Sequence, residues 1–532
     1  MARTKRGSTV LISAVVVVAA IGLVLTHSGF ADMQRDMETQ LRKLVSVARL
    51  AQMYYVEDVE WDGAVEGAIS GMLEKMDPHS VYIPPQKVDE NKENFSGKYE
   101  GIGIQFDIID GYLTVISPIA GSPSDELGIR PGDRIVKING ESAIGIDRDE
   151  VPEQLKGPKG TTVDVTIQRE EEAALLEFTI VRDVIPITTI TASFMQDDTT
   201  GYLAVNRFAA ITASEVEDAL VELEGRGMRR LVLDLRGNSG GYLHEAVKLA
   251  GKFIGGHKRI VFTKGRSGEV DEEYFADKFG RRTVRTYPLI ILVDRGSASA
   301  SEIVAGAVQD YDRGLIVGEN SFGKGLVQKE FPLQDGSAVR ITTAKYYTPS
   351  GRCIQRDYKG KDLDEYYADV PDSTWSSPDS LDHRPLFHTE AGRPVYGGGG
   401  IMPDRYVPNT RLSLSPELVN RMVQKQVFFE VSNEFATHHG ELSDDMRGFR
   451  DTFAVDGALF NRFRDVCAEK EIDVDGEAFA RDGDYLRLRL KAEIARRFWN
   501  SDGYYLVMLS ADGQFQTAMG SFSEARKLAA VQ

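Results

Sequence analysis

Three serines alternate within residues 294–303, at Ser297, Ser299 and Ser301. They follow an apolar run typical of a buried strand, residues 289–293, and precede a stretch with the composition of a helix. One serine at such a point caps the helix by satisfying the free N–H groups of its first turn. Three alternating serines exceed what a cap requires. The same position would set a hydroxyl nucleophile against the positive end of the helix dipole, beside a backbone N–H that can stabilise an oxyanion.

A lysine between two glycines follows another strand run. Residues 318–325 read Gly-Glu-Asn-Ser-Phe-Gly-Lys-Gly, which places Lys324 next to the last glycine. The spacing approaches a phosphate-binding loop, but Gly325 stands where a serine or threonine should hold magnesium, and residues 326–328 continue toward a strand. Nucleotide binding is therefore a weak alternative. Taken alone, Lys324 would be a solvated loop residue. In a dry pocket, however, desolvation lowers the pKa of a lysine until its neutral amine can accept the proton of a serine.

A glycine-rich loop, residues 234–241, supplies a third candidate segment. Gly240 and Gly241 offer backbone N–H groups without side-chain obstruction, which suits an oxyanion hole, although any tight strand-to-helix connection uses such glycines. None of the eight histidines, including His79 and His244 near turn or glycine-rich segments, belongs to a recognisable nucleophile motif. A Ser-His-Asp triad therefore stays open without a motif to support it.

The three loops belong to a region, residues 201–349, in which strand and helix patterns alternate. Its strand runs include residues 231–235, 289–293 and 315–317. This alternation predicts an α/β core, and sheets of that kind place their chemistry in the loops that leave the carboxyl ends of the strands. The candidate site is therefore expected in these loops.

A β-rich module precedes the α/β region, with short strand patterns and Gly, Pro and Asn-Gly turns between residues 99 and 182. Its loop Gly101, Ile102, Gly103 and Ile104 comes before an edge strand. Successive N–H groups of such a loop can point at the terminal carboxylate of a peptide. The peptide then pairs with the edge strand as an additional strand of the sheet. The simpler alternative is a bend or bulge. The module resembles a PDZ domain of the protease-associated kind, and the resemblance is carried by residues 101–104, 117–120, 127–135 and 138–140.

Taken together, these segments resemble the C-terminal processing, or tail-specific, serine peptidases, which combine a serine–lysine dyad with a PDZ domain. The resemblance implies that Ser299 is the nucleophile, that Lys324 is the general base and that Gln328 orients the lysine. It runs from about residue 40 to residue 410. It is carried by residues 234–236, 240–241, 297–302, 318–328, 346–351 and 399–404.

The same resemblance implies an oxyanion hole made from backbone N–H groups. Its donors would be Ala300 and Gly240, the second less secure because Gly241 is adjacent. Ser297 and Ser301 would then be local hydrogen-bonding and capping residues. The implied fold is a multi-domain α/β protein, with a peptidase core of the crotonase-like type, a β-rich PDZ domain and helical N- and C-terminal regions.

The implied activity is that of a serine endopeptidase acting by acyl transfer. Neutral Lys324 would take the Ser299 proton, and the alkoxide would attack a peptide carbonyl, with no metal or other cofactor required. The partners would be unfolded or tailed polypeptides whose free C-termini the PDZ domain captures. A catalytically silent scaffold that binds C-terminal tails is the alternative, and the retention of both serine and lysine argues against it. The net charge of −18 argues against a nucleic-acid partner.

The N-terminus has the pattern of an export signal. Arg3, Lys5 and Arg6 precede an uncharged apolar run, residues 10–26. Its length favours a retained membrane anchor over a cleaved signal peptide, and the basic flank places the N-terminus in the cytoplasm. We therefore expect the rest of the chain on the periplasmic side of the inner membrane, within the cell envelope.

The remaining patterns define the expected domains. Residues 33–76 show helical periodicity, which is compatible with packing on the next domain or on a second copy in a homo-oligomer. Leu486, Leu490, Ile494 and Phe498 form a stripe at four-residue spacing that predicts helix core near the C-terminus. The expected segments are a signal or anchor (1–31), an N-terminal helical region (32–96), a PDZ domain (97–183), a peptidase core (184–410) with a polar insertion (357–400), and a mainly helical C-terminal region (411–532).

Overall fold

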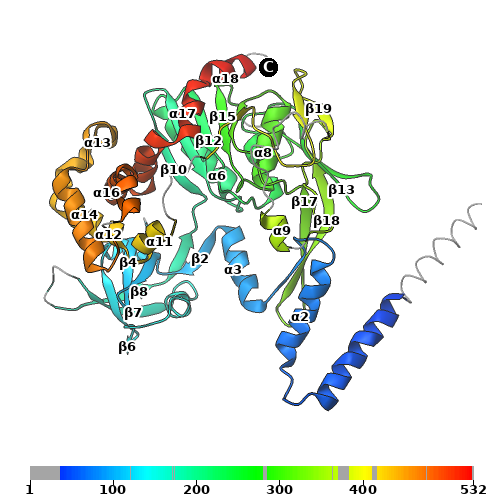
Figure 1. The fold of residues 1–532 in the computed structure, drawn as a ribbon, viewed down its shortest axis with the longest axis horizontal. Coiled ribbons are helices and arrows are strands. Elements are labelled where there is room, and N and C mark those ends of the chain that lie inside the picture. Colours follow the sequence, from blue (N-terminus) through cyan, green and yellow to red (C-terminus); the bar gives the residue numbers. More distant parts are fainter. Residues whose placement is uncertain are drawn as a thin grey trace, which may run out of the picture. The chain divides into compact units, whose positions relative to one another are not determined.

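The computed structural model describes residues 36–529 apart from residues 120, 170, 171, 173, 280–283, 362, 369–382, 410–415 and 475. The chain divides into two units, Met1–Met76 and Asp77–Gln532. Figure 1 traces the course of both.

The first unit is helical where it is described. Residues 36–54 form one helix, and α2 (Trp61–Glu74) forms another, as the periodicity of residues 33–76 predicts. The Glu60 side chain caps α2 by accepting a hydrogen bond from the Gly63 N–H. The expected anchor, residues 10–26, lies outside the described residues. Within residues 36–529 as described, no helix is both long and apolar enough to cross a bilayer.

The centre of the second unit is a six-stranded sheet. Its strands run in the order β10-β11-β12-β15-β16-β21, and every neighbouring pair is parallel except β10 with β11. All five residues of β15 are buried, because a parallel sheet covered on both faces needs apolar side chains at every position. The strands are β10 (Ile190–Met195), β11 (Thr200–Val205), β12 (Arg230–Asp234), β15 (Leu289–Val293), β16 (Leu315–Gly318) and β21 (Arg405–Tyr406).

Helices cover both faces of this sheet, as Figure 1 shows. Successive side chains of a strand point to opposite faces. Leu231 and Leu233 accordingly pack in one apolar cluster with helices α6 to α8, whereas Val232 packs in a second cluster with residues of α17 and α18 near the C-terminus. The covering helices are α6 (Thr212–Gly225), α7 (Leu243–Ala250), α8 (Ala300–Asp310), α17 (Gly513–Gly520) and α18 (Phe522–Ala529).

The second unit also contains a separate, five-stranded sheet. It has the order β1-β18-β13-β14, and β17 pairs with β18 as an antiparallel hairpin in which Gln328 faces Thr342. Residues 326–328 therefore continue into a strand, as predicted. The strands are β1 (Val81–Ile83), β13 (Arg259–Lys264), β14 (Val270–Phe275), β17 (Leu326–Pro332) and β18 (Ala338–Tyr347).

The β-rich module forms its own antiparallel sheet with its own apolar cluster. The order is β3-β4-β5-β7-β8, with β6 on β5, so β3 is an edge strand as expected. The short strands β2 (Lys98–Gly101) and β9 (Asp183–Pro186) pair where the chain enters and leaves the module. Its other elements are β3 (Ile104–Ile109), β4 (Tyr112–Pro118), α4 (Pro123–Glu126), β5 (Arg134–Ile138), β6 (Glu141–Ser142), α5 (Val151–Leu155), β7 (Thr162–Gln168) and β8 (Leu176–Val181); α3 (Pro85–Ser96) precedes β2.

The polar insertion and the C-terminal region complete the unit. In the described part of residues 357–400, the insertion contains α9 (Leu363–Ala368) and the hairpin β19 (Leu386–His388) and β20 (Pro394–Tyr396). Leu486, Leu490 and Ile494 are fully buried in the C-terminal helical core, as their spacing predicts, and Phe498 packs against the same cluster. The helices there are α11 (Pro416–Gln424), α12 (Val427–His438), η2 (Gly440–Asp444), α13 (Met446–Thr452), α14 (Gly457–Glu469), α15 (Glu477–Arg481), α16 (Gly483–Met508) and η3 (Leu509–Ala511).

Candidate active site

The three candidate loops leave the carboxyl ends of three adjacent parallel strands. The glycine-rich loop follows β12, the serine loop follows β15, and the lysine loop follows β16. The carboxyl ends of parallel strands meet at one edge of the sheet, which is where open α/β sheets bind ligands. The fold thus brings the loops to the edge where the sequence predicts the chemistry.

The outer serines of the alternating run tie the loops together. The Ser297 hydroxyl donates to the Leu235 carbonyl oxygen at 2.8 Å, and the Ser301 hydroxyl donates to the Asn238 carbonyl oxygen at 2.8 Å. The Phe322 N–H donates to the Ser297 carbonyl oxygen at 2.9 Å. The serine loop is therefore hydrogen-bonded to the glycine-rich loop on one side and to the lysine loop on the other.

Ser299 is the half-buried middle serine, and it immediately precedes α8. Its φ of 54° and ψ of −110° are values that residues other than glycine rarely adopt, and such strain is found where surrounding contacts hold a functional residue in place. The Tyr346 hydroxyl supplies one such contact, because it donates to the Ser299 carbonyl oxygen at 3.0 Å.

Glu302 joins the serine loop to the lysine loop. Its side chain is fully buried, and its Oε2 accepts hydrogen bonds from the Ser299 N–H at 2.8 Å and from the Lys324 N–H at 2.9 Å. The other oxygen, Oε1, accepts from the Ser321 hydroxyl and the Gly323 N–H. Burial raises the pKa of Glu302, and the four hydrogen bonds oppose that rise. One carboxylate oxygen thus fixes the main chains of Ser299 and Lys324 next to each other.

Glu302 had no role in the sequence interpretation, although one signal was available. A serine followed three residues later by a glutamate is the spacing of a capping box, in which the glutamate accepts from the N–H of the cap residue. The Ser299 N–H makes that bond. No local signal could have shown that the same carboxylate also accepts hydrogen bonds from the lysine loop.

The surroundings of Lys324 favour its neutral form. The side chain is half-buried, and burial is the largest cause that lowers the pKa of Lys324 from its usual range. The positive charge of Arg340 lowers it further, whereas the negative charges of Glu302 and Asp77 oppose the shift. The direction is the one that a lysine acting as a general base requires.

Gln328, which the family resemblance makes the orienting residue for the lysine, lies on β17 four positions beyond it. Its side-chain Nε2 donates to the main-chain carbonyl oxygen of His79. Within the described part of the chain, Oε1 of Gln328 has no hydrogen-bond partner. The structure therefore anchors one end of the amide and leaves its acceptor end open.

The two expected oxyanion donors, Ala300 and Gly240, differ in the hydrogen bonding of their N–H groups. Ala300 is the first residue of α8, so its N–H has no carbonyl partner within the helix. The Gly240 N–H, in contrast, donates to Oδ1 of Asn238 at 2.9 Å, because the fully buried Asn238 amide is itself held by the Val205 carbonyl oxygen. The adjacent Gly241 N–H has no hydrogen-bond partner among the described residues, so which of the two glycines donates to an oxyanion stays a prediction.

Gly240 has a steric role that the sequence did not reveal. Its φ is 102°, and a Cβ atom at this position would lie 2.7 Å from Ser299 Cβ and 2.9 Å from the Ala300 nitrogen. Contacts that short are forbidden, so any larger residue would push against the serine. The absence of a side chain at Gly240 lets the glycine-rich loop approach the serine loop closely.

The turn formed by residues 77–80 also reaches the lysine loop, which the sequence gave no reason to expect. His79 is 7% exposed, and its imidazole packs edge-on against Phe322, two residues before Lys324. Burial first, and then the nearby charge of Lys324, lower the pKa of His79 to about 4. His79 and Gln328 are separated by 249 positions, so no sequence pattern connects them.

The alternatives considered for these loops find little support. The N–H groups of Gly323 and Lys324 donate to Glu302, and that of Gly325 donates to Gln355, so the lysine loop does not offer them to a phosphate. No histidine hydrogen-bonds to Ser299 in the described part of the chain. Among the described residues, no cluster of three or more His, Cys, Asp or Glu side chains could hold a metal ion.

The candidate peptide-binding loop contains a left-handed glycine and two N–H groups without a hydrogen-bond partner among the described residues. Gly103 has a φ of 80°, and a Cβ there would lie 2.2 Å from the Ser122 side chain, so the position requires glycine. Ile102 and Ile104 are buried in the module's apolar cluster. Within the described chain, the N–H groups of Ile102 and Gly103 have no hydrogen-bond partner, and β3 begins directly after them.

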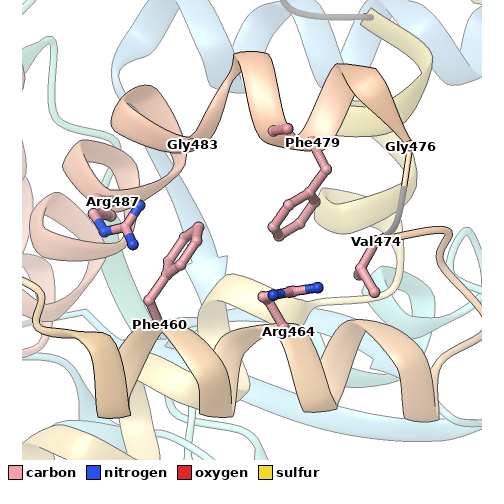
Figure 2. Close-up of a pocket in the computed structure, with 8 residues that line it drawn as sticks. Phe460, Arg464, Val474, Gly476, Phe479, Gly483 and Arg487 are labelled. Carbon is pink, nitrogen blue, oxygen red and sulfur yellow. The ribbon is translucent and has the colours of Figure 1, made fainter.

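A cavity of about 340 Å³ lies elsewhere, between α14, α15 and the start of α16 in the C-terminal region. Figure 2 shows the Arg487 guanidinium beside the Phe460 ring, with Phe479 pointing toward α14. Its lining contains no residue of the three loops. It is therefore separate from the candidate active site.

Comparisons with known protein families match four segments of the chain. Residues 199–364 match Peptidase family S41, and residues 114–169 match the PDZ domain. Residues 25–86 match the N-terminal domain of the activating protease CtpB, and residues 418–500 match a family of unknown function.

Curated relatives extend the match over most of the chain. The carboxy-terminal processing protease CtpB of Bacillus subtilis (strain 168) is 36% identical over 329 residues, which cover 61% of this chain and 67% of the relative. The carboxy-terminal-processing protease of Bartonella bacilliformis (strain ATCC 35685 / KC583 / Herrer 020/F12,63) is 36% identical over 337 residues, covering 63% and 76%. A solved photosystem II D1 C-terminal processing protease is 27% identical, with coverage of 62% and 91% and a TM-score of 0.34.

The fold and the matches together define a serine-type endopeptidase that carries a PDZ domain. The chain belongs to peptidase family S41, among the carboxy-terminal processing proteases.

Proposed function

We propose that the chain cleaves polypeptides with Ser299 as nucleophile and Lys324 as general base. The observation that carries this proposal is the shared hydrogen-bond acceptor, because the N–H groups of both residues donate to Oε2 of Glu302. The lowered pKa of Lys324 supports it independently.

The proposed reaction uses these residues in turn. Neutral Lys324 takes the Ser299 proton as the oxygen attacks the substrate carbonyl carbon, and the Ala300 N–H, with an N–H of the Gly240-Gly241 pair, binds the oxyanion. The Lys324 ammonium then returns the proton to the leaving amine, and an acyl-enzyme ester remains on Ser299. A water molecule, deprotonated by Lys324, hydrolyses that ester and regenerates both residues. Gln328 orients Lys324 throughout through its open Oε1.

The PDZ domain supplies the substrate in this proposal. The open N–H groups of Ile102 and Gly103 bind the terminal carboxylate, and the free edge of β3, which starts at Ile104, pairs with the tail. Gly101 precedes this loop at the end of β2. Tail capture raises the local concentration of the rest of the substrate at Ser299.

A cleavage assay tests the dyad. Wild-type protein should degrade an unfolded reporter with a free apolar C-terminus, and Ser299→Ala and Lys324→Ala should each lose about 10⁴-fold or more in kcat/KM, the scale seen when members of a catalytic unit are removed. The exposed residues Ser267 and Lys329 give matched controls, because Ser267→Ala and Lys329→Ala should leave cleavage unchanged. Full activity in either dyad variant would contradict the proposal.

Amidation of the reporter's C-terminus tests the PDZ role. It removes the carboxylate, so we expect KM to rise with little change in kcat at saturation. Equal binding of free and amidated tails would contradict tail capture. Tail binding by wild-type protein without any cleavage would instead favour the scaffold.

We also propose that the peptidase works outside the cytoplasm, anchored by residues 10–26, because a basic leader precedes this apolar run. Expression of the full chain in a Gram-negative host tests this. External protease should digest the protein in spheroplasts but not in intact cells, and a variant that lacks residues 10–26 should remain protected in spheroplasts. Protection of the full chain in spheroplasts would contradict the proposal.

A further inference from the structure

The turn at residues 77–80 is fixed to the strand that faces Gln328. The Asp77 carboxylate accepts hydrogen bonds from the His79 N–H at 2.9 Å, the Ser80 N–H at 3.0 Å and the Ser80 hydroxyl at 2.6 Å. It also accepts from the Thr342 hydroxyl at 3.0 Å, and the Thr342 N–H donates to the Ser80 hydroxyl at 3.1 Å. Thr342 is the direct partner of Gln328 across the β17–β18 ladder.

This arrangement determines which end of the Gln328 amide is available. A carbonyl oxygen can only accept a hydrogen bond, so the His79 carbonyl must hold the NH₂ end of the amide. The acceptor Oε1 is left for a donor on the other side. The amine of Lys324, whose side chain starts four positions earlier, is a donor of that kind.

The His79 side chain packs against the lysine loop and the insertion. Its Nε2 lies 3.1 Å from the Tyr366 hydroxyl, and Tyr366, on α9 of the insertion, is 1% exposed. The Arg356 guanidinium stacks on the rings of Phe322 and Tyr366, at 3.9 and 4.1 Å from their centroids. These contacts close an aromatic layer over the lysine loop, and such a layer keeps water from the groups beneath it.

We propose that His79 is a positioning residue for the general base: its carbonyl orients Gln328 toward Lys324, and its imidazole shields Lys324 from water. The Asp77 carboxylate holds His79 in that place. The inference rests on the proposed Ser299–Lys324 dyad and adds to it a turn that is not among the residues carrying the family resemblance described above.

The electrostatics of the region fit this role. The groups that act on His79 are Lys324, Asp77 and Arg356, and the two cations oppose its protonation. Its pKa of about 4 keeps the imidazole neutral near pH 7, so His79 adds no positive charge beside the lysine. The groups that act on Lys324 itself are Arg340, Glu302 and Asp77.

A double-mutant cycle tests the route through Gln328. Asp77→Ala and Gln328→Ala should each lower kcat by roughly tenfold to a hundredfold, the scale of a small misplacement of a reacting group. If Asp77 acts through Gln328, the double variant should be no slower than Gln328→Ala alone. Losses that multiply in the double variant would overturn the proposal. Asp77→Asn, which keeps an oxygen for the two N–H donors, should recover most of the activity.

The chain offers a matched control for this cycle. Asp335 holds a similar turn at the other end of the same hairpin, where it accepts from the Ser337 N–H and hydroxyl. Asp335→Ala should leave kcat unchanged. If Asp77→Ala fails to fold, Ser80→Ala takes its place in the cycle, because it removes the hydrogen bond from the Thr342 N–H and leaves the Asp77 carboxylate, with its bond from the Thr342 hydroxyl, intact.

The pH profile of kcat/KM tests the shielding. His79→Ala lets water approach Lys324, so the pKa of the lysine should rise and the acid limb of the profile should move up by about one pH unit. His79→Phe refills the space and should restore the wild-type limb, and the exposed His257→Ala should not move it. A limb that stays in place in His79→Ala would overturn the proposal. The dyad itself is judged separately, by the Ser299→Ala and Lys324→Ala variants, so the two ideas can fail independently.

Discussion

The two ends of α8 each bury an acidic side chain, and only one of the two has a charged partner. At the start of the helix, Glu302 is surrounded by three N–H groups and one hydroxyl, all of them neutral donors. At the end, Asp310 accepts from the Ser350 N–H at 2.9 Å and also lies 2.7 Å from the guanidinium of Arg352, which is fully buried. The helix dipole explains part of the difference, because it stabilises an acid at the N-terminus and disfavours one at the C-terminus.

The chemistry proposed at the N-terminal end explains the rest. A guanidinium beside Glu302 would place a permanent positive charge and a strong donor next to Ser299 and Lys324. Neutral donors satisfy the carboxylate and at the same time hold the two reacting loops together. In this proposal one end of the helix is arranged for catalysis and the other for structure alone, and substitutions at the two ends should separate these roles.

The largest effect is expected for Glu302→Ala. It leaves four buried donors without an acceptor, which should destabilise the fold by more than about 3 kcal/mol, because each unsatisfied group costs about 1–3 kcal/mol. It also removes the link between the main chains of Ser299 and Lys324, so kcat should fall by at least about a hundredfold in the molecules that remain folded. Chemical denaturation and single-turnover kinetics measure the two quantities. An active, stable variant would remove the basis for the comparison.

Asp310→Ala should affect stability alone. It leaves the Arg352 guanidinium buried without its acidic partner, at a cost of about 3–5 kcal/mol. The folded fraction should cleave substrate at the wild-type rate, because Ser299 and Lys324 contact the other end of the helix. Urea unfolding combined with active-site titration checks this. A loss of kcat comparable with that of Glu302→Ala would show that the two ends are not independent.

Acid should destabilise the fold near the catalytic end through His79. Its pKa falls from the usual value near 6.5 to about 4 on folding, so the unfolded chain takes up the proton first as the pH drops. The corresponding stability is fully present above about pH 6.5 and is lost as the pH falls toward 4, by about 3 kcal/mol in total. His79→Phe should abolish this part of the pH dependence in unfolding experiments. An unchanged acid response would show that His79 is solvated.

The smallest effects are expected for the outer serines of the alternating run. Ser297→Ala and Ser301→Ala each remove one hydroxyl that donates to a carbonyl of the glycine-rich loop, which should cost about 1 kcal/mol. Activity should fall far less than in Ser299→Ala. Thermal unfolding and steady-state kinetics of the three variants together check this ranking, and a loss of cleavage in Ser301→Ala equal to that in Ser299→Ala would contradict it.

Much of this protein could be predicted from local sequence patterns. The apolar runs identify β12, β15 and β16, the composition after Ser299 predicts α8, and the order of motifs predicts the family and the PDZ domain. These features are local because periodicity, turn residues and short motifs act over a few positions. The same patterns also place the three loops at the carboxyl ends of parallel strands.

Other features depend on contacts between distant segments. No local spacing could show that Glu302 also binds the lysine loop, that the Asn238 side chain accepts from the Gly240 N–H, or that the His79 turn reaches Gln328. Each is a hydrogen bond whose donor and acceptor meet only after the sheets have assembled. The sequence by itself therefore determined the strands, the motifs and the residue types available for catalysis, whereas the tertiary structure alone decided which buried polar groups pair with one another, because burial leaves each donor and acceptor to find its partner within the folded protein.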